Sequence, residues 1–296
     1  MIRTTHVGSL PRPDNLIQTM FAKQEGVPID PVALEQRTRT AVAEVVGKQR
    51  EAGVDVMSDG EMGKPSYVTY ITDRLDGFGG TSQPLTYADL VDFPVLRDKV
   101  FGDPGRKRRR TPACDAPISV RDPEAARTDI DHLLAALKPG ETGFMNAASP
   151  GVIELYFRND FYASREEYLF AIANAMRVEY EAITEAGLLL QVDCPDLAMG
   201  RHIEFADKSL DEFREQARLN IEALTTRRRT SPPTRCGCTC AGATTKARIT
   251  ATCRSPTSST SSSRPTPPRS RSRPPTPATR TSGRSSRTSG CPRARS

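Results

Sequence analysis

The sequence LLLQVDCPD, at residues 188–196, decides the fold. Its apolar residues form a run of the length of a buried strand, which Asp193 ends before Pro195 stops it from continuing. The segment EAG at 185–187 closes a helical pattern directly before it, so a helix, a glycine turn and a strand follow one another. A buried strand with a carboxylate at its carboxyl end is the arrangement in which α/β enzymes present reactive groups.

The same unit occurs earlier in the chain. A second EAG, at 51–53, ends another helical pattern, and the strand-like run VDVM at 54–57 leads into the acidic segment SDGEMG at 58–63. Helices alternating with buried strands predict a parallel sheet with βαβ crossovers. Polar residues gather at several strand ends and no G-x-G-x-x-G motif occurs, which favours a (β/α)₈ TIM-type barrel over a dinucleotide-binding sheet. About five of the eight barrel strands precede residue 224, so we predict an α/β barrel that is incomplete at the C-terminus.

The amino-acid composition divides the chain near Leu224. Residues 225–296 hold 16 of the 42 Lys and Arg residues and no Asp or Glu, so residues 1–224 carry 26 basic and 36 acidic residues, a net charge of −10. The C-terminal range has no aromatic residue, and Ile249 is its only large aliphatic residue. A segment without apolar side chains cannot bury a core. We therefore predict a folded domain at 1–224 and a disordered basic tail at 225–296.

The tail uses a narrow set of amino acids. Nearly all of its residues are Arg, Ser, Thr, Pro, Ala, Gly or Cys, whose codons have G or C at the middle position. A GC-rich gene translated in a shifted frame produces this set, so we interpret the tail as an out-of-frame product and the barrel as truncated. The alternative is a genuine arm that binds nucleic acid by neutralising phosphates. Without aromatic residues for stacking, such an arm would bind without regard to base sequence.

The positions of the cysteines and of the apolar runs indicate the cellular compartment of the protein. Five of the seven cysteines lie in the tail, and only Cys114 and Cys194 lie in residues 1–224, which favours a reducing environment. The chain start has no apolar signal-peptide core, and no apolar run reaches the roughly 20 residues that cross a bilayer. We therefore expect a cytoplasmic protein without a membrane partner.

Polar residues follow three of the predicted strands. Two prolines prevent a helix in TTHVGSLPRP at 4–13, which places its polar residues in a loop beyond the first strand end. The carboxyl ends of parallel strands meet at one edge of a sheet, so side chains from these segments should share one site. Each residue also has an ordinary role open to it, such as capping a helix or shaping a turn. The candidate substrate-binding residues are His6, Gly8, Ser9, Arg12, Glu61 and Asp193.

Four motifs in this order resemble the cobalamin-independent methionine synthase superfamily, specifically its catalytic C-terminal barrel and short stand-alone relatives. They are TTHVGSLPRP at 4–13, SDGEMG at 58–63, AASPG at 147–151 and LLLQVDCPD at 188–196, and the resemblance covers residues 1–224. It implies a zinc-dependent S-methyltransferase of methionine biosynthesis, which carries a methyl group from 5-methyltetrahydropteroyltriglutamate to the thiol of homocysteine.

The resemblance also implies roles for individual residues. Gly8 and Ser9 would contact the amino acid, and Glu61 and Asp193 would hold its ammonium group. On the side of the folate-like donor, the resemblance points to Cys114 and Ser149.

Several positions depart from the family. Ala113, Ala148 and Met199 stand where an arginine, a tryptophan and a glutamate are expected, so the alkyl donor stays open, and epoxide addition to the thiol of coenzyme M is an alternative. The family's zinc ligands, a His-x-Cys pair, a Glu and a further Cys, are not in place. We therefore expect zinc in the intact family, no zinc on this chain, and an inactive product. A third alternative is a non-enzymatic protein whose tail binds nucleic acid.

Overall fold

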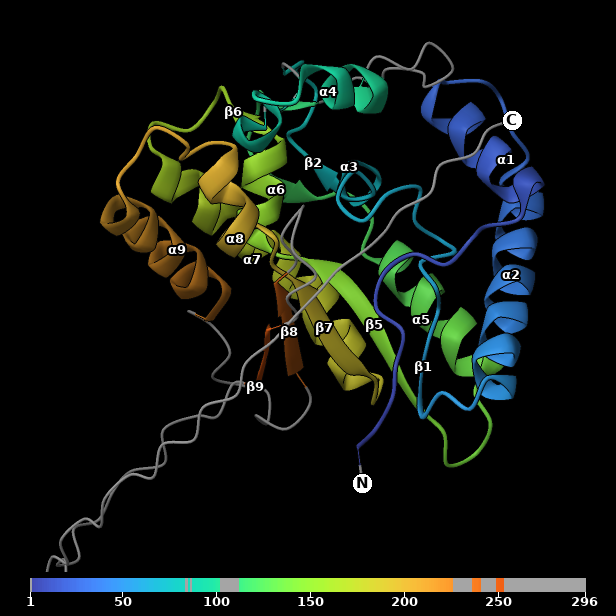
Figure 1. Cartoon of the computed structure of the whole chain (residues 1–296). Helices are drawn as coiled ribbons and strands as arrows, with labels where there is room; N and C mark the ends of the chain where they lie inside the picture. The colour runs from blue at the N-terminus through green and yellow to red at the C-terminus, as the bar shows by residue number, and fades with distance from the viewer. Residues whose placement is uncertain are drawn as a thin grey trace, which may run out of the picture. The chain divides into compact units, whose positions relative to one another are not determined.

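A mainly parallel sheet lies at the centre of the computed structural model (Figure 1). The structure describes residues 2–82, 85, 87–101, 112–225, 236–240 and 249–252, which belong to the unit Met1–Ser255. The strand order is β1-β5-β7-β8-β9, and a parallel bridge from Thr5 to Val56 adds the N-terminal segment beside β1. The strands are β1 (Val56–Ser58), β5 (Thr142–Ala148), β7 (Leu189–Asp193) and β8 (Cys236–Cys240), all parallel, and β9 (Ile249–Thr252), antiparallel to β8.

Helices connect the parallel strands, as the alternating pattern predicts. The Asp30 carboxylate accepts hydrogen bonds from the backbone N–H groups of Val32 and Ala33, which begins the first long helix. Gly53 and Gly187, with φ of 74° and 84°, follow two of the long helices in the left-handed conformation that favours glycine. No helix in the described ranges is long and apolar enough to cross a membrane. The long helices are α2 (Pro31–Glu51), α5 (Glu124–Ala136), α7 (Arg165–Glu185) and α9 (Leu210–Thr225).

Shorter elements occupy the connections. Two small sheets pair β2 (Leu75–Asp76) with β4 (Ser119–Val120) and β3 (Ala113–Cys114) with β6 (Arg158–Asn159). Strands β2, β3 and β4 lie in the connection between β1 and β5, and β6 follows α6. The basic run at 106–110 in that connection lies outside the described residues. The short helices are α1 (Asp14–Gln24), α3 (Ile71–Arg74), η1 (Ala88–Leu90), α4 (Pro94–Phe101), α6 (Pro150–Tyr156), α8 (Asp196–Met199) and η2 (Gly200–His202).

Two apolar clusters hold the helices on the sheet. The first packs side chains such as Val46 of α2 and Leu133 of α5 against Met145 and Val192 of the central strands. The second surrounds the carboxyl end of β5 and includes Tyr168 of α7. Burying one large apolar side chain contributes about 1.5–3 kcal/mol, so the two clusters supply the main driving force for this arrangement. They fix the strands whose carboxyl ends carry the polar residues.

The strands β8 and β9 lie inside the range for which composition predicts disorder. Residues 236–240 and 249–252 within that range are strands of the sheet, and the disorder of the tail stays a prediction. Strand β8 pairs with β7 in the register Val192 to Cys238 and Asp193 to Thr239. Without β8, this edge of β7 would present unpaired backbone N–H and C=O groups. An extended segment can pair with these groups through its own backbone, so the pairing depends little on its side chains. The other residues from 226 to 296 lie outside the described ranges.

Candidate functional site

The loop after β1 places Glu61 at the centre of the candidate site. Asp59 accepts a hydrogen bond from the Glu61 backbone N–H at 3.0 Å, and this tight turn gives Gly60 and Glu61 φ values of 63° and 57°. Glu61 is the only non-glycine residue with positive φ in the described ranges. Such a conformation costs about 1–3 kcal/mol and persists where the surroundings hold it, which is typical of functional sites.

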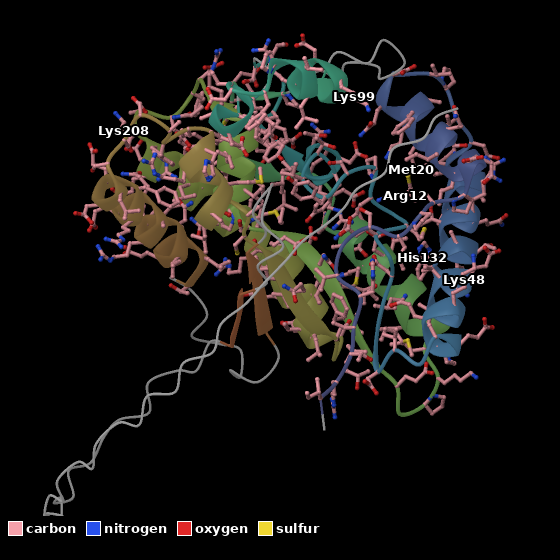
Figure 2. All side chains as sticks on the ribbon, viewed as in Figure 1. Arg12, Met20, Lys48, Lys99, His132 and Lys208 are labelled. Atoms are coloured by element: carbon pink, nitrogen blue, oxygen red, sulfur yellow. The ribbon has the colours of Figure 1, made fainter. Side chains whose placement is uncertain are left out.

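The N-terminal loop is bonded to this turn. The Ser9 hydroxyl donates to Glu61 Oε2 at 2.5 Å. Arg12, labelled in Figure 2, donates to the Glu61 carbonyl from Nε at 3.2 Å and from Nη2 at 2.8 Å. Gly8, in the same loop, has a φ of 96°, a conformation that favours glycine. The structure therefore brings two of the predicted loop residues, Ser9 and Arg12, to Glu61.

Asp193 ends β7 and faces the same region. Its Oδ2 accepts a hydrogen bond from Asn146 Nδ2 at 3.0 Å. Burial raises the pKa of Asp193 to about 6; the Asn146 bond opposes this rise and the negative charge of Glu61 adds to it. The two carboxylates are therefore close enough to repel one another in a buried setting. The negative charge of Glu61 thus acts on Asp193, and their sharing of one substrate site stays a prediction.

Two buried polar atoms in this region have no hydrogen-bond partner among the described residues. They are Oε1 of Glu61, whose side chain is 1% exposed, and Nε2 of His6. Leaving a buried polar group unpaired costs about 1–3 kcal/mol, and more for a charged group. Each such atom in a native structure calls for an explanation, such as an ordered water, an ion, a catalytic role or a bound ligand.

Several residues of the site were not predicted from the sequence. Lys64 is 2% exposed, and its Nζ donates to the carbonyl of Asn146. The Tyr67 hydroxyl lies 2.5 Å from that of Tyr156. Burial raises the pKa of Tyr67 to about 12, and the charges of Asp193 and Glu61 add to this, which places its hydroxyl near the carboxylates. A polar Asn146 within an apolar strand, and a lysine directly after SDGEMG, were the available signals.

Ser149 and Cys114, predicted for the donor side, already have partners within the protein. The Ser149 hydroxyl caps α6, accepting from the Val152 N–H at 3.0 Å, and donates to Asp196 Oδ1 at 2.7 Å. Cys114 is fully buried, and its thiol donates to the Ala116 carbonyl at 3.4 Å. Burial raises the pKa of Cys114 to about 11, so its thiol stays protonated at neutral pH. Their assignment to a donor site stays a prediction.

Gly151, at the start of α6, lies against Asp196, which Ser149 bonds, and against Asn220. A Cβ at this position would lie 2.2 Å from Asp196 Oδ2 and 2.5 Å from Asn220 Nδ2. We expect Gly151→Ala to lower the free energy of unfolding by about 1–3 kcal/mol, because the Asp196–Asn220 pair must move. Urea denaturation measures the loss. Gly47→Ala in α2 is the control: nothing lies within 4 Å of its Cβ, so a gain of about 0.5–1 kcal/mol is expected there.

No group of three or more His, Cys, Asp or Glu side chains is placed to hold a metal ion in the part of the chain that the structure describes. Zinc in proteins prefers thiolate and imidazole ligands. The Cys194 thiol, next to Asp193, instead lies 3.6 Å from the Val192 carbonyl as a hydrogen-bond donor. The described residues of the site therefore do not fit a zinc ion.

Comparison with known proteins places these features in a family. The family model described as "Cobalamin-independent synthase, Catalytic domain" matches residues 1–227. The methionine synthase of Sulfolobus acidocaldarius is 26% identical over 214 residues, covering 72% of this chain and 57% of that protein. The 5-methyltetrahydropteroyltriglutamate–homocysteine methyltransferase of a Synechococcus strain is 26% identical, covering 71% of this chain and 26% of that protein. The chain spans about half the length of the first of these relatives.

Solved structures of the same kind share the fold. A putative vitamin-B12-independent methionine synthase from Listeria monocytogenes matches with a TM-score of 0.56 and 18% identity, over 81% of this chain and 64% of that one. A B12-independent methionine synthase from Shewanella sp. W3-18-1 matches with a TM-score of 0.50 and 19% identity, over 66% of this chain and 50% of that one. At these identities the likeness concerns the fold alone.

Proposed function

Because the chain belongs to the cobalamin-independent methionine synthase family, by its catalytic domain, we propose that its acidic site binds the ammonium group of homocysteine or a similar thiol amino acid. That thiol would be the acceptor of a methyl group. The observation that carries the proposal is the buried pair of Glu61 and Asp193, in which Glu61 Oε1 has no partner among the described residues.

The charge of the site supports an ammonium ligand. Four acidic residues are buried or nearly so, Asp59, Glu61, Glu179 and Asp193. Two buried cations, Lys64 and Arg74, stand against them. Burial raises the pKa of Asp59 to about 6, Lys64 opposes the rise, and the charges of Asp129 and Glu61 add to it. A primary ammonium adds one positive charge and three hydrogen-bond donors. It would relieve the repulsion between the carboxylates and complete Glu61 Oε1.

The fold supports the same family. We propose that residues 1–224 form part of a (β/α)₈ barrel, since the N-terminal segment, β1, β5 and β7 are successive parallel neighbours. Long helices connect the last three of these strands, and polar residues follow their carboxyl ends, where such barrels hold their active sites.

We further propose that residues 225–296 are out of frame and that this chain is inactive. The support is the tail's composition and the absence of the family's zinc ligands from the sequence. The DNA sequence of the gene tests the first point: the neighbouring frame should encode a His-x-Cys pair near residue 238. A neighbouring frame without such a pair would contradict the proposal.

The binding proposal is tested by comparing two thiols that differ in one group. L-homocysteine and 4-sulfanylbutanoate share the thiol and the carboxylate, and only the first has an amine. By isothermal titration calorimetry at pH 7 we expect homocysteine to bind at least tenfold more tightly, since a charge-assisted hydrogen bond contributes about 1.5–3 kcal/mol. Equal affinities would contradict the proposal. Coenzyme M, a thiol with a sulfonate and no amine, is the third ligand, and preferential binding of it would favour thiol–epoxide chemistry instead.

A further inference from the structure

Lys64 is a buried cation beside the proposed ammonium site, and neither the motifs nor the comparisons assign it a role. Its side chain follows the Glu61 turn and is 2% exposed. The Lys64 backbone N–H donates to the Glu61 carbonyl at 3.1 Å, and its own carbonyl accepts a hydrogen bond from Arg12. The residue is therefore fixed at its backbone by the same loop that holds Glu61.

The Lys64 ammonium reaches from β1 to β5. Nζ donates to the carbonyl of Asn146, a residue 82 positions away in the sequence. The side chain of Asn146 in turn donates from Nδ2 to Asp193 Oδ2 at 3.0 Å. One chain of hydrogen bonds thus runs from Lys64 through Asn146 to the carboxylate that ends β7.

Groups from other elements hold the ammonium in this position. Lys64 Nζ lies 3.9 Å from Glu179 Oε1 of α7 and 4.5 Å from the centre of the Tyr70 ring. The Tyr70 hydroxyl donates to Glu179 Oε1 at 2.9 Å, and Arg74 Nη1 lies 2.8 Å from Glu179 Oε2. Glu179 is thus shared with a second cation, so part of the Lys64 charge acts toward the carboxylates of the site.

We propose that Lys64 is a positioning residue for the ammonium site: it fixes Asn146 on β5 and thereby holds the Asp193 carboxylate ionised and facing Glu61. The inference rests on the proposed function, because it treats Asp193 as a group that binds the ligand. The electrostatics agree, since the Lys64 charge lowers the pKa of both Asp193 and Asp59 against the effect of burial. A lysine that only neutralised Glu179 would not affect Asp193.

The titration of Asp193 in the full chain separates these two roles. Carboxyl-carbon NMR, with the Asp193 signal identified by its loss in Asp193→Asn, gives the titration midpoint without any ligand. In Lys64→Met the midpoint should rise by about one pH unit or more, because a nearby opposite charge shifts a carboxyl pKa by 1–3 units. In Lys64→Arg, which keeps the charge, it should stay within a few tenths of a unit. An unchanged midpoint in a folded Lys64→Met protein would overturn the inference.

Two further variants keep the test decisive. Arg50→Met removes another partly buried ion pair, Arg50–Glu141 at 2.5 Å, near the amino end of β5, and should leave the Asp193 midpoint unchanged. If Lys64→Met does not fold, Glu179→Gln replaces it: without that carboxylate, more of the Lys64 and Arg74 charge acts on Asp193, so its midpoint should fall. A midpoint that does not fall would overturn the inference.

Ligand binding distinguishes failure of this inference from failure of the proposed function. At pH 7 the Lys64→Met protein should bind L-homocysteine about twofold more weakly than the wild type if the midpoint rises by about one unit, and about tenfold more weakly if it rises by about two, because more of its Asp193 is protonated. A wild-type protein that does not bind homocysteine would refute the proposed function, and the ligand-free titration would still decide the role of Lys64. Binding by the wild type with an unmoved Asp193 midpoint in Lys64→Met would refute the inference alone.

Discussion

Replacing Arg74 by methionine is expected to lower the free energy of unfolding by about 3–5 kcal/mol, the range for removing one partner of a buried ion pair. Arg74 is 8% exposed; its Nη1 lies 2.8 Å from Glu179 Oε2, and its Nη2 bonds the carboxylate of Asp129. Methionine occupies similar space but removes this cation from Asp129 and leaves Glu179 with Lys64 alone, and burial makes the ionised carboxylates costly. Urea denaturation at pH 7 measures the loss.

Arg121 provides the matched control. It pairs with Asp76 at 2.6 Å, but the two side chains are 52% and 47% exposed, so Arg121→Met should cost no more than about 1 kcal/mol. Equal losses in the two variants would contradict a buried role for Arg74.

The dependence of stability on pH tests the same variant independently. Burial alone would raise the pKa of Glu179, but the charges of Arg74 and Lys64 hold it below its ordinary value. The stability that Glu179 contributes is therefore present at neutral pH and is lost as the pH falls through that pKa. The Arg74→Met protein has already lost much of this contribution, so its stability should fall less than that of the wild type on acidification.

Local signals explain why much of the fold could be predicted from the sequence. The helix α2 has an Asp30 cap, a proline at its first position and a glycine just past its end, and each signal acts within a few residues. The strand β7 is a short apolar run between a glycine and an aspartate. By contrast, α1 has Leu16 and Met20 as its only buried residues, too few to produce a visible periodic pattern. Helix α1 is therefore stabilised mainly by its packing on α2, and less by the helix propensity of its own residues.

The candidate site could be predicted only in part, because its residues differ in where their partners lie. Glu61 and Asp193 follow strand-like runs directly, so their places at strand ends could be read locally. Lys64 and Glu179 depend on each other and on β5, and such long-range partners leave no mark in a local pattern. The strands β8 and β9 show the reverse case, since composition predicts disorder there while β8 pairs with β7 and β9 pairs with β8.

Asp193→Asn is expected to stabilise the protein at pH 7 and, at the same pH, to weaken L-homocysteine binding at least tenfold. Burial, opposed by the Asn146 bond and increased by the charge of Glu61, raises the pKa of Asp193 to about 6 from its ordinary 3.8. With a raised pKa, the stability that Asp193 contributes is complete below about pH 4 and is lost as the pH rises through 6. At pH 7 the ionised carboxylate therefore costs up to about 3 kcal/mol.

The substitution removes this charge and keeps the hydrogen bond. The Oδ1 of an asparagine accepts from Asn146 Nδ2, which now donates to Asp193 at 3.0 Å, so little packing is lost. Urea denaturation should give a stability gain that is largest near pH 7 and absent near pH 4. Asp55→Asn is the control of opposite sign, because bonds from Thr4 hold the pKa of that exposed carboxyl below its ordinary value. A folded Asp193→Asn protein that loses stability at pH 7 would give this carboxylate a structural role. A gain in stability together with weaker binding of L-homocysteine would instead show that the Asp193 charge lowers stability and serves the ligand. That result is expected if Asp193 and Glu61 bind the ammonium group together.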